Sequence, residues 1–267
     1  MPVAKCTTIM TVPDHLKSPL IDLLLALADD KLFLGHRNSD WTGLGPILEE
    51  DIAFSHMAQD EIAHAQAIYE FIGGMTGKKA DEIAFGRAVH EYRCASIVEV
   101  PDEFDWATAV ARKFYCDHFD LLRLQRLANS SHKPLADLCA RIAAEEQLHV
   151  DHVDGWIVRL GSGTMESRMR MQQAIDALAP HATWLFEPFD GLKILVDTKV
   201  YPGSDSTMYD AWVAAIKNVC LRAGLTVTLE VGSPDEKHGR HGVATPHRKP
   251  LLDEMCEVYR LEPGAAW

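Results

Sequence analysis

Two short motifs place a glutamate and a histidine three residues apart, in Glu61-Ile62-Ala63-His64 and in Glu146-Gln147-Leu148-His149. Residues three apart share one face of an α-helix, so each pair can direct a carboxylate and an imidazole at one point. Carboxylate and imidazole groups bind iron and manganese, and open coordination positions would admit dioxygen. One such motif arises often by chance, but two motifs in register with apolar helical stripes favour a metal site.

A third carboxylate and a lysine belong to the same pattern. Asp117 precedes Glu146 by 29 residues and occupies an inward position of its own predicted helix. Carboxylates on neighbouring helices, combined with two Glu-x-x-His motifs, are the ligands of ferritin-like di-iron proteins. Counting back 30 residues from Glu61, the remaining ligand position falls on Lys31, whereas Asp30 lies about 100° away around the helix. The position expected to bind metal therefore holds a cation, unless a shift in register brings Asp30 inward.

The charges of these residues leave two interpretations open. Three carboxylates carry three negative charges and Lys31 carries one positive charge, so two more positive charges are needed for balance. Two protonated histidines would supply them in a metal-free network, and one divalent metal ion with neutral histidines would do so equally well. We expect a remnant metal site without a cofactor, with a mononuclear or dinuclear iron site as the alternative. Its residues are Glu61, His64, Asp117, Glu146 and His149.

Four long helices are predicted to carry this site, because apolar residues recur along them at steps of three and four. Their ranges are about 19–37, 46–72, 106–128 and 134–160. One long connection, 74–105, separates two helix pairs, as in ferritin-like bundles. Further helices are expected over about 164–186, 206–223 and 248–260. The fold class is therefore all-α: a single ferritin-like four-helix-bundle domain over 1–267, with a helical C-terminal extension over about 164–267.

Local signals set the expected ends of these helices. Gly73-Gly74 predicts the end of the second helix and Gly161-Ser162-Gly163 the end of the fourth, because glycine favours helix C-caps. Strand signals are weak and confined to residues 96–100 and 192–200.

Composition excludes several classes of function. The chain has 267 residues, and its 39 acidic residues against 26 basic ones give a formal charge of −13. Such a chain has no global attraction for nucleic acid or for anionic membranes. The sequence shows no membrane-spanning run or signal peptide, and its six cysteines include no Cys-x-x-Cys pair. We therefore expect a cytoplasmic protein.

Sequence motifs spread over nearly the whole chain resemble those of the phenylacetyl-CoA epoxidase family. They include Leu34-Gly35-His36-Arg37 with Asp40-Trp41, and Arg159-Leu160-Gly161-Ser162-Gly163-Thr164 after the second Glu-x-x-His motif. The C-terminal Gly242-Val243-Ala244-Thr245 and the final Trp267 are similar to the closing segment of the family. Within this family, the chain resembles the non-catalytic C-type subunits.

This resemblance implies a role in aerobic phenylacetate catabolism. It implies a ferritin-like subunit that pairs with a homologous catalytic subunit, which carries the di-iron site and epoxidises phenylacetyl-CoA. The chain would then be an oxidoreductase subunit without its own catalytic site. C-type subunits have an eroded ligand set, but five of six positions here keep ligand-type residues. A metal-binding oxygenase is therefore the alternative function, and a homo-oligomer is the alternative assembly for the isolated chain.

A basic segment near the C-terminus contrasts with the acidic chain. Two interpretations stay open: an ordinary solvated loop, or a contact with a partner subunit or with a CoA phosphate. Its residues are Lys237, His238, Arg240, His241, His247 and Arg248.

Overall fold

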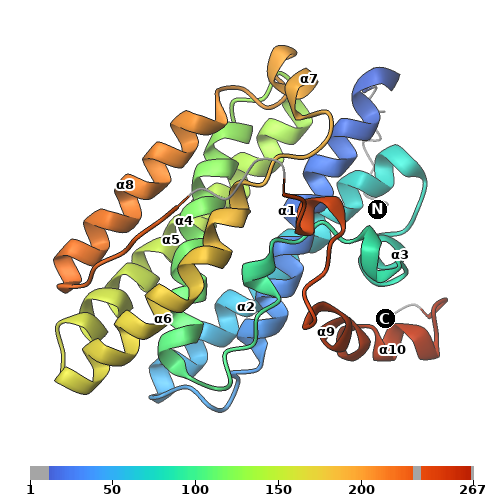
Figure 1. The fold of residues 1–267 in the computed structure, drawn as a ribbon. Helices are drawn as coiled ribbons and strands as arrows, with labels where there is room; N and C mark the ends of the chain where they lie inside the picture. The colour runs from blue at the N-terminus through green and yellow to red at the C-terminus, as the bar shows by residue number, and fades with distance from the viewer. Residues whose placement is uncertain (1–11, 231–235, 266–267) are drawn as a thin grey trace, which may run out of the picture.

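Four long helices pack around one core in the structure, a computed structural model that describes residues 12–230 and 236–265. They are α1 (Asp14–Ser39), α2 (Leu48–Thr76), α4 (Trp106–Leu127) and α5 (Lys133–Gly161). α1 packs along α2 and α4 packs along α5, with one long connection between the two pairs (Figure 1). No strand occurs within the described ranges, and the all-α prediction is confirmed.

The helix ends differ from the predicted ones in two places. α1 begins five residues before Pro19, which lies inside the helix. α2 continues through Gly73-Gly74 and ends at Thr76. It is capped by Gly77, whose φ of 78° is the left-handed conformation that glycine adopts readily. A glycine inside a helix costs only about 1 kcal/mol, which packing along α1 can offset. The end of α5 at Gly161 agrees with the prediction.

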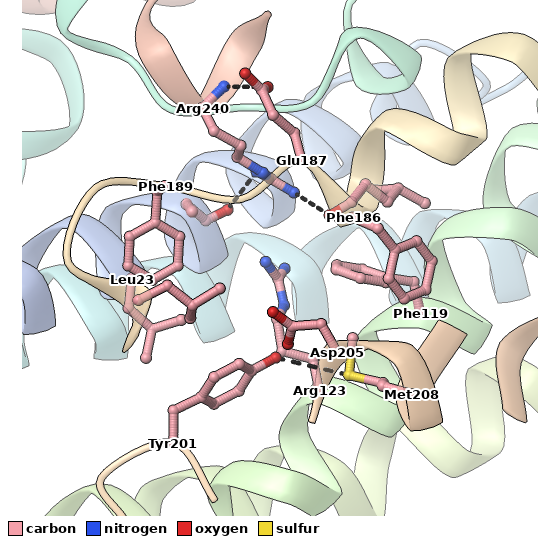
Figure 2. Close-up of a pocket in the computed structure, with 13 residues that line it drawn as sticks. Leu23, Phe119, Arg123, Phe186, Glu187, Phe189, Tyr201, Asp205, Met208 and Arg240 are labelled. Atoms are coloured by element: carbon pink, nitrogen blue, oxygen red, sulfur yellow. Dashed lines mark hydrogen bonds between the residues drawn. The ribbon is translucent and has the colours of Figure 1, made fainter. Parts of the chain in front are cut away.

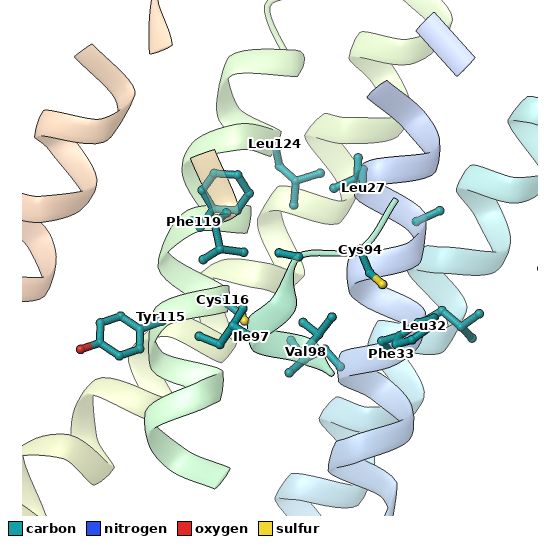
Figure 3. Packing of buried hydrophobic residues seen from close by; sticks show 14 of the residues in the cluster. Leu27, Leu32, Phe33, Cys94, Ile97, Val98, Tyr115, Cys116, Phe119 and Leu124 are labelled. Atoms are coloured by element: carbon teal, nitrogen blue, oxygen red, sulfur yellow. The ribbon is translucent and has the colours of Figure 1, made fainter. Parts of the chain in front are cut away.

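The connection between α2 and α4 is helical where a weak strand was expected. It contains α3 (Ala80–Phe85) and two 3-10 turns, Val89–Glu91 and Ser96–Val98. Figure 3 shows Ile97 and Val98 of the second turn between α1 and α4, in contact with the hydrophobic core. The prediction of a strand over 96–100 is wrong because a short apolar run is equally suited to a buried turn.

The C-terminal extension covers the bundle on two sides. Its helices are α6 (Met165–Thr183), α7 (Leu192–Asp197), α8 (Asp205–Ala223), α9 (Arg248–Met255) and α10 (Glu257–Leu261), with 3-10 turns at Trp184–Phe186 and Gly239–His241. α6 and α8 pack on α4 and α5, where the buried Trp212 indole donates a hydrogen bond to the Tyr115 carbonyl oxygen. The weak strand expected over 192–200 is α7 instead, and Cys256 divides the helix predicted over 248–260.

Charged residues interrupt the apolar surfaces of the bundle helices. Among the described helices, none has the length of apolar sequence that a membrane crossing requires. Many of the charged side chains are buried instead. Those that concern the site are Asp30, Lys31, Glu61, Lys113, Asp117, Asp120, Arg123, Glu146 and Arg240.

Candidate metal centre

The ammonium group of Lys31 on α1 lies in the middle of the bundle, surrounded by one carboxyl group from each of the three other bundle helices. Its Nζ is 2.7 Å from Glu61 Oε2, 2.7 Å from Glu146 Oε2 and 3.1 Å from Asp120 Oδ2. The Lys31 side chain has no exposed surface. The charge count from the sequence paired Lys31 with Asp117, but Asp120 takes that place, one turn further along α4.

A second buried ammonium group, that of Lys113, was not predicted. Its Nζ is 2.8 Å from Asp117 Oδ2 and 3.9 Å from Glu61 Oε1. Glu61 therefore lies between two ammonium groups, with one carboxylate oxygen near each. The sequence does contain a signal for this arrangement. Alternating steps of four and three residues from Trp106 along α4 pass through Lys113, Asp117 and Asp120.

The two predicted histidines have different surroundings. His149 joins the charged residues, with Nδ1 3.2 Å from Glu61 Oε1 and Nε2 3.3 Å from Asp60 Oδ2. His64 is directed toward the surface of the bundle, and its Nε2 lies 2.5 Å from Oε2 of the exposed Glu145. His64 is therefore the one predicted ligand that the structure does not bring into the cluster.

Close packing of α1 on α2 allows Lys31 to reach Glu61. Gly35 follows Lys31 by one turn and faces α2 directly. A Cβ atom at Gly35 would lie 2.8 Å from Ile62 Cγ1 and 3.0 Å from Glu61 Cβ, which is closer than such atoms approach. Glycine is therefore required here for the helix spacing at the level of the site.

Asp30 does not reach Lys31, so the shift in register considered for it does not occur. Its carboxylate instead accepts hydrogen bonds from two buried arginines, at 2.7 Å from Arg240 Nη2 and 3.1 Å from Arg123 Nη2. Arg123 Nη2 is also 2.7 Å from Asp120 Oδ1. The ion pairs thus continue from Lys31 through Asp120 and Arg123 to Asp30 and Arg240.

The charges of this buried network can balance without a metal ion. The network has five carboxylates and four permanent cations, so a fifth positive charge or one protonated carboxyl group is needed. Protonation of either His149 or Glu146 provides it. The carboxylates are Asp30, Glu61, Asp117, Asp120 and Glu146, and the cations are Lys31, Lys113, Arg123 and Arg240.

The pKa shifts of the network agree with this charge balance. Burial raises the pKa of Glu146 to about 8, so its carboxyl group holds a proton near neutral pH. Burial alone would also raise the pKa of Glu61, but the Lys31 ammonium and the hydrogen bond from His149 bring it well below its usual range. Burial lowers the pKa of Lys31, and the charges of Asp120, Glu146 and Glu61 more than reverse that effect. Lys31 and Glu61 therefore form a permanent ion pair.

Glu146 makes folding depend on pH. Its folded pKa of about 8 lies above the ordinary value of 4.5, so the folded chain keeps a proton that the unfolded chain has lost. The stabilisation is complete below the unfolded pKa and disappears as the pH rises through the folded pKa. We expect the free energy of unfolding to fall by up to about 1.4 kcal/mol per pH unit between about pH 5 and 8. Urea unfolding across this range measures the slope.

Glu146→Gln should flatten this slope, because the amide keeps the shape of the protonated carboxyl group but cannot ionise. Glu166→Gln is the matched control, because the Glu166 side chain is 70% exposed on α6. An unchanged slope in Glu146→Gln would show that another group carries the proton.

The cluster meets only some of the requirements of a metal centre. Four of the predicted residues lie close enough to bind one ion: Glu61, Asp117, Glu146 and His149. Oδ1 of Asp117 accepts no hydrogen bond from a described residue, and its lone pairs would suit a metal ion. The Lys113 ammonium is nevertheless 2.8 Å from this carboxylate, and two divalent ions would add four positive charges to a balanced network. The residues present therefore do not fit a dinuclear centre.

The basic C-terminal segment is partly buried, so the prediction of a partner contact is wrong for its two arginines. Arg248 Nη2 lies 2.6 Å from Glu99 Oε1, and Arg240 Nη2 lies 2.7 Å from Asp30 Oδ2. The buried carboxylates draw both guanidinium groups inward, because an unpaired buried charge is costly. Lys237 and His247 are exposed, and His238 and His241 are partly exposed. For these four residues the partner contact stays a prediction.

Arg240 also lines a small cavity beside the network. Figure 2 shows its guanidinium group and that of Arg123 next to aromatic side chains that include Phe119, Phe186 and Tyr201. The cavity volume is about 40 Å³, which is room for a few water molecules. Pockets for organic ligands measure about 300 Å³ or more, so this cavity is not a substrate site.

Comparison with known proteins relates the whole chain to one family. The sequence profile of the family described as "Phenylacetic acid catabolic protein" matches residues 6–267. The chain is 30% identical over 244 residues to the C subunit of the 1,2-phenylacetyl-CoA epoxidase of Escherichia coli (strain K12). That alignment covers 91% of this chain and 97% of the relative, so the similarity includes the bundle and the C-terminal helices alike.

Proposed function

The chain belongs to the phenylacetic acid catabolic protein family, and we propose that it is a structural subunit of a phenylacetyl-CoA epoxidase complex. In this role it pairs with a homologous subunit that carries the di-iron site, and it stabilises that subunit in the cytoplasm. The chain is then part of an oxidoreductase without performing the oxidation itself. The similarity to a relative that is itself one subunit of an epoxidase supports membership of a multisubunit enzyme.

The observation that carries this proposal is the position of two lysines. The ammonium groups of Lys31 and Lys113 lie among the carboxylates that a dinuclear centre would use, at 2.7 to 3.9 Å. An ammonium group supplies positive charge and hydrogen bonds but cannot exchange electrons. The bundle can therefore keep its buried carboxylates paired without a redox centre, which supports a role in assembly.

The rival function is that of a metalloprotein with iron held by the surviving ligands. Oδ1 of Asp117 favours it, because among the described residues no donor satisfies this oxygen, whereas Oδ2 lies 2.8 Å from the Lys113 ammonium. Iron binding there would have to displace Lys113 from a fully buried position. The two functions therefore differ in whether His149 and its neighbours take part in the reaction of the complex.

His149→Gln in the co-expressed oxygenase complex distinguishes the two functions. If the chain is structural, epoxidation per assembled complex should stay within about twofold of wild type, because the reaction takes place in the other subunit. If His149 is an iron ligand, we expect turnover to fall by about 100-fold or more. Turnover is measured on purified complex, so that any loss of folding does not enter the rate.

The matched control is His118→Gln. His118 is also a buried histidine paired with a carboxylate, at 2.8 Å from Asp154 Oδ1, but it lies outside the charged cluster. A large loss in His149→Gln with normal turnover in the control would contradict the structural role.

A further inference from the structure

A turn with unusual backbone geometry holds a phenylalanine out of the protein. Glu103 and Phe104 have φ angles of 52° and 55°, and two successive residues other than glycine in this region are uncommon. The Asp102 carboxylate holds the turn, because it accepts hydrogen bonds from the Phe104 backbone N–H and from the Trp41 indole, each 3.1 Å long. The Phe104 side chain is nevertheless 64% exposed. Conformations of this kind persist where the surrounding structure requires them, often at binding sites.

Phe104 forms one wall of an apolar groove. The groove has a volume of about 290 Å³, and its lining includes Trp41, Leu44, Leu160 and Arg170. Leu44 is 56% exposed at its edge. Met169 lines the neighbouring groove, which shares Arg170, and is also largely exposed. The exposed apolar side chains are therefore adjacent rather than scattered.

Further exposed apolar residues extend this surface at the same end of the bundle. α1 and α5 end here, and α2, α4 and α6 begin here, in the lower part of the view in Figure 1. We name these residues the apolar end surface: Leu44, Ile47, Leu48, Ile52, Phe104, Met165 and Met169. Single exposed apolar residues are ordinary, but seven at one end of the bundle, with Leu44, Phe104 and Met169 on two adjoining grooves, are typical of an interaction surface.

The charges around the surface restrict what can bind to it. Glu103, Asp105 and Glu166 lie along the two grooves, and Arg170 is paired with Glu166 at 2.8 Å and with Asp105 at 3.8 Å. The surface therefore combines an apolar centre with an acidic edge. A second copy of this chain, with a formal charge of −13 and the same acidic edge, would be repelled.

We propose that the apolar end surface docks the homologous catalytic subunit of the complex. An apolar side chain of that subunit enters the groove beside Phe104 and Leu44, and lysine or arginine side chains face Glu103, Asp105 and Glu166. This inference rests on the proposed function and adds the surface through which the chain binds the catalytic subunit.

The test is the affinity of the purified chain for the catalytic subunit of the same organism, measured by biolayer interferometry. The double variant Leu44→Ser, Phe104→Ser should bind at least about 100-fold more weakly, as expected for a central apolar anchor. Glu103→Lys with Glu166→Lys should weaken binding about 10-fold and reduce its dependence on salt. These side chains are exposed, so circular dichroism and thermal melting should be unchanged.

The matched control is Leu221→Ser with Leu261→Ser, because both leucines are more than three-quarters exposed on other parts of the chain. Equal binding by the control and wild type, with weak binding by the Leu44 and Phe104 double variant, is the expected result. If wild type binds and the double variant binds equally well, the docking surface is wrong while the proposed function stands. If wild type does not bind at all, both are wrong. If wild type forms a homodimer and the Leu44 and Phe104 double variant does not, the surface binds a second copy of this chain, and the proposed docking of the catalytic subunit is wrong.

Discussion

Replacing Lys31 by methionine is expected to lower the free energy of unfolding by about 3–5 kcal/mol at neutral pH. Methionine fills a similar volume but removes the ammonium group that lies 2.7 to 3.1 Å from the carboxylates of Glu61 and Asp120 and from the carboxyl group of Glu146. Buried carboxylates that have lost their cation must either stay charged without solvent around them or take up protons, and both lower the free energy of unfolding. Equilibrium unfolding in urea, followed by circular dichroism, measures the loss.

The pH dependence of this loss identifies its cause. Lys31 lowers the pKa of Glu61, so this contribution is present above the ordinary pKa and disappears as the pH falls through the folded value. The difference between wild type and Lys31→Met should therefore shrink in acid. Lys193→Met is the control, because the Lys193 side chain is 87% exposed and its replacement should change stability by less than about 0.5 kcal/mol. A similarly small effect of Lys31→Met would mean that the buried ion pairs contribute nothing to folding.

Replacing both lysines is expected to convert the network into an iron site. Lys31→Glu with Lys113→Met removes two cations and adds a carboxylate at the position where the resemblance to di-iron proteins requires one. The cluster then has the charge to bind Fe²⁺, and we expect its affinity to exceed that of wild type by at least about 100-fold. Lys31→Glu alone should gain less, because Lys113 still lies 2.8 Å from Asp117.

Anaerobic titration with Fe²⁺ measures this gain, and thermal melting gives a second readout. A bound ion stabilises only the folded chain, so iron should raise the melting temperature of the double variant and not that of wild type. Lys193→Glu adds a carboxylate on an exposed helix face and should bind no more iron than wild type does. If the double variant binds Fe²⁺ no more tightly than wild type, the two lysines are not what excludes metal from this site.

The sequence was sufficient to predict the bundle because its long helices have clear apolar stripes. Leu20, Leu24 and Leu27 on α1 are all fully buried, as their spacing indicates. The two Glu-x-x-His motifs could be assigned to the interior of the bundle for the same reason, because a residue on an apolar stripe faces the core. The helical crossover could not be predicted, because Ile97 and Val98 are buried by tertiary packing that a short apolar run does not specify.

Lys113 shows that a correctly predicted helix can still give an incompletely predicted site. Two stripes can be drawn along α4, one through Phe114 and Leu121 and the other through Lys113 and Asp120. All four residues are buried, but Lys113 and Asp120 face the charged interior of the bundle, where they lie near Glu61 and Lys31. α6 and α8 pack on α4 as well, so more than one of its faces is covered. Periodicity alone does not tell which of the two stripes faces the site, and it failed to identify Lys113 as a buried residue. The same failure applies to Arg240, whose partner Asp30 is 210 residues away in sequence.

The iron content of the wild-type chain decides whether lysines have replaced the metal in this bundle. The chain is purified with its catalytic partner from iron-replete cells, the two subunits are separated, and metal is measured in each by mass spectrometry. We expect the iron to remain with the partner and this chain to hold far less than one ion, because Lys31 and Lys113 take the place of metal among its carboxylates. Two iron ions per chain, as in a ferritin-like di-iron centre, would contradict the replacement of the metal by lysine.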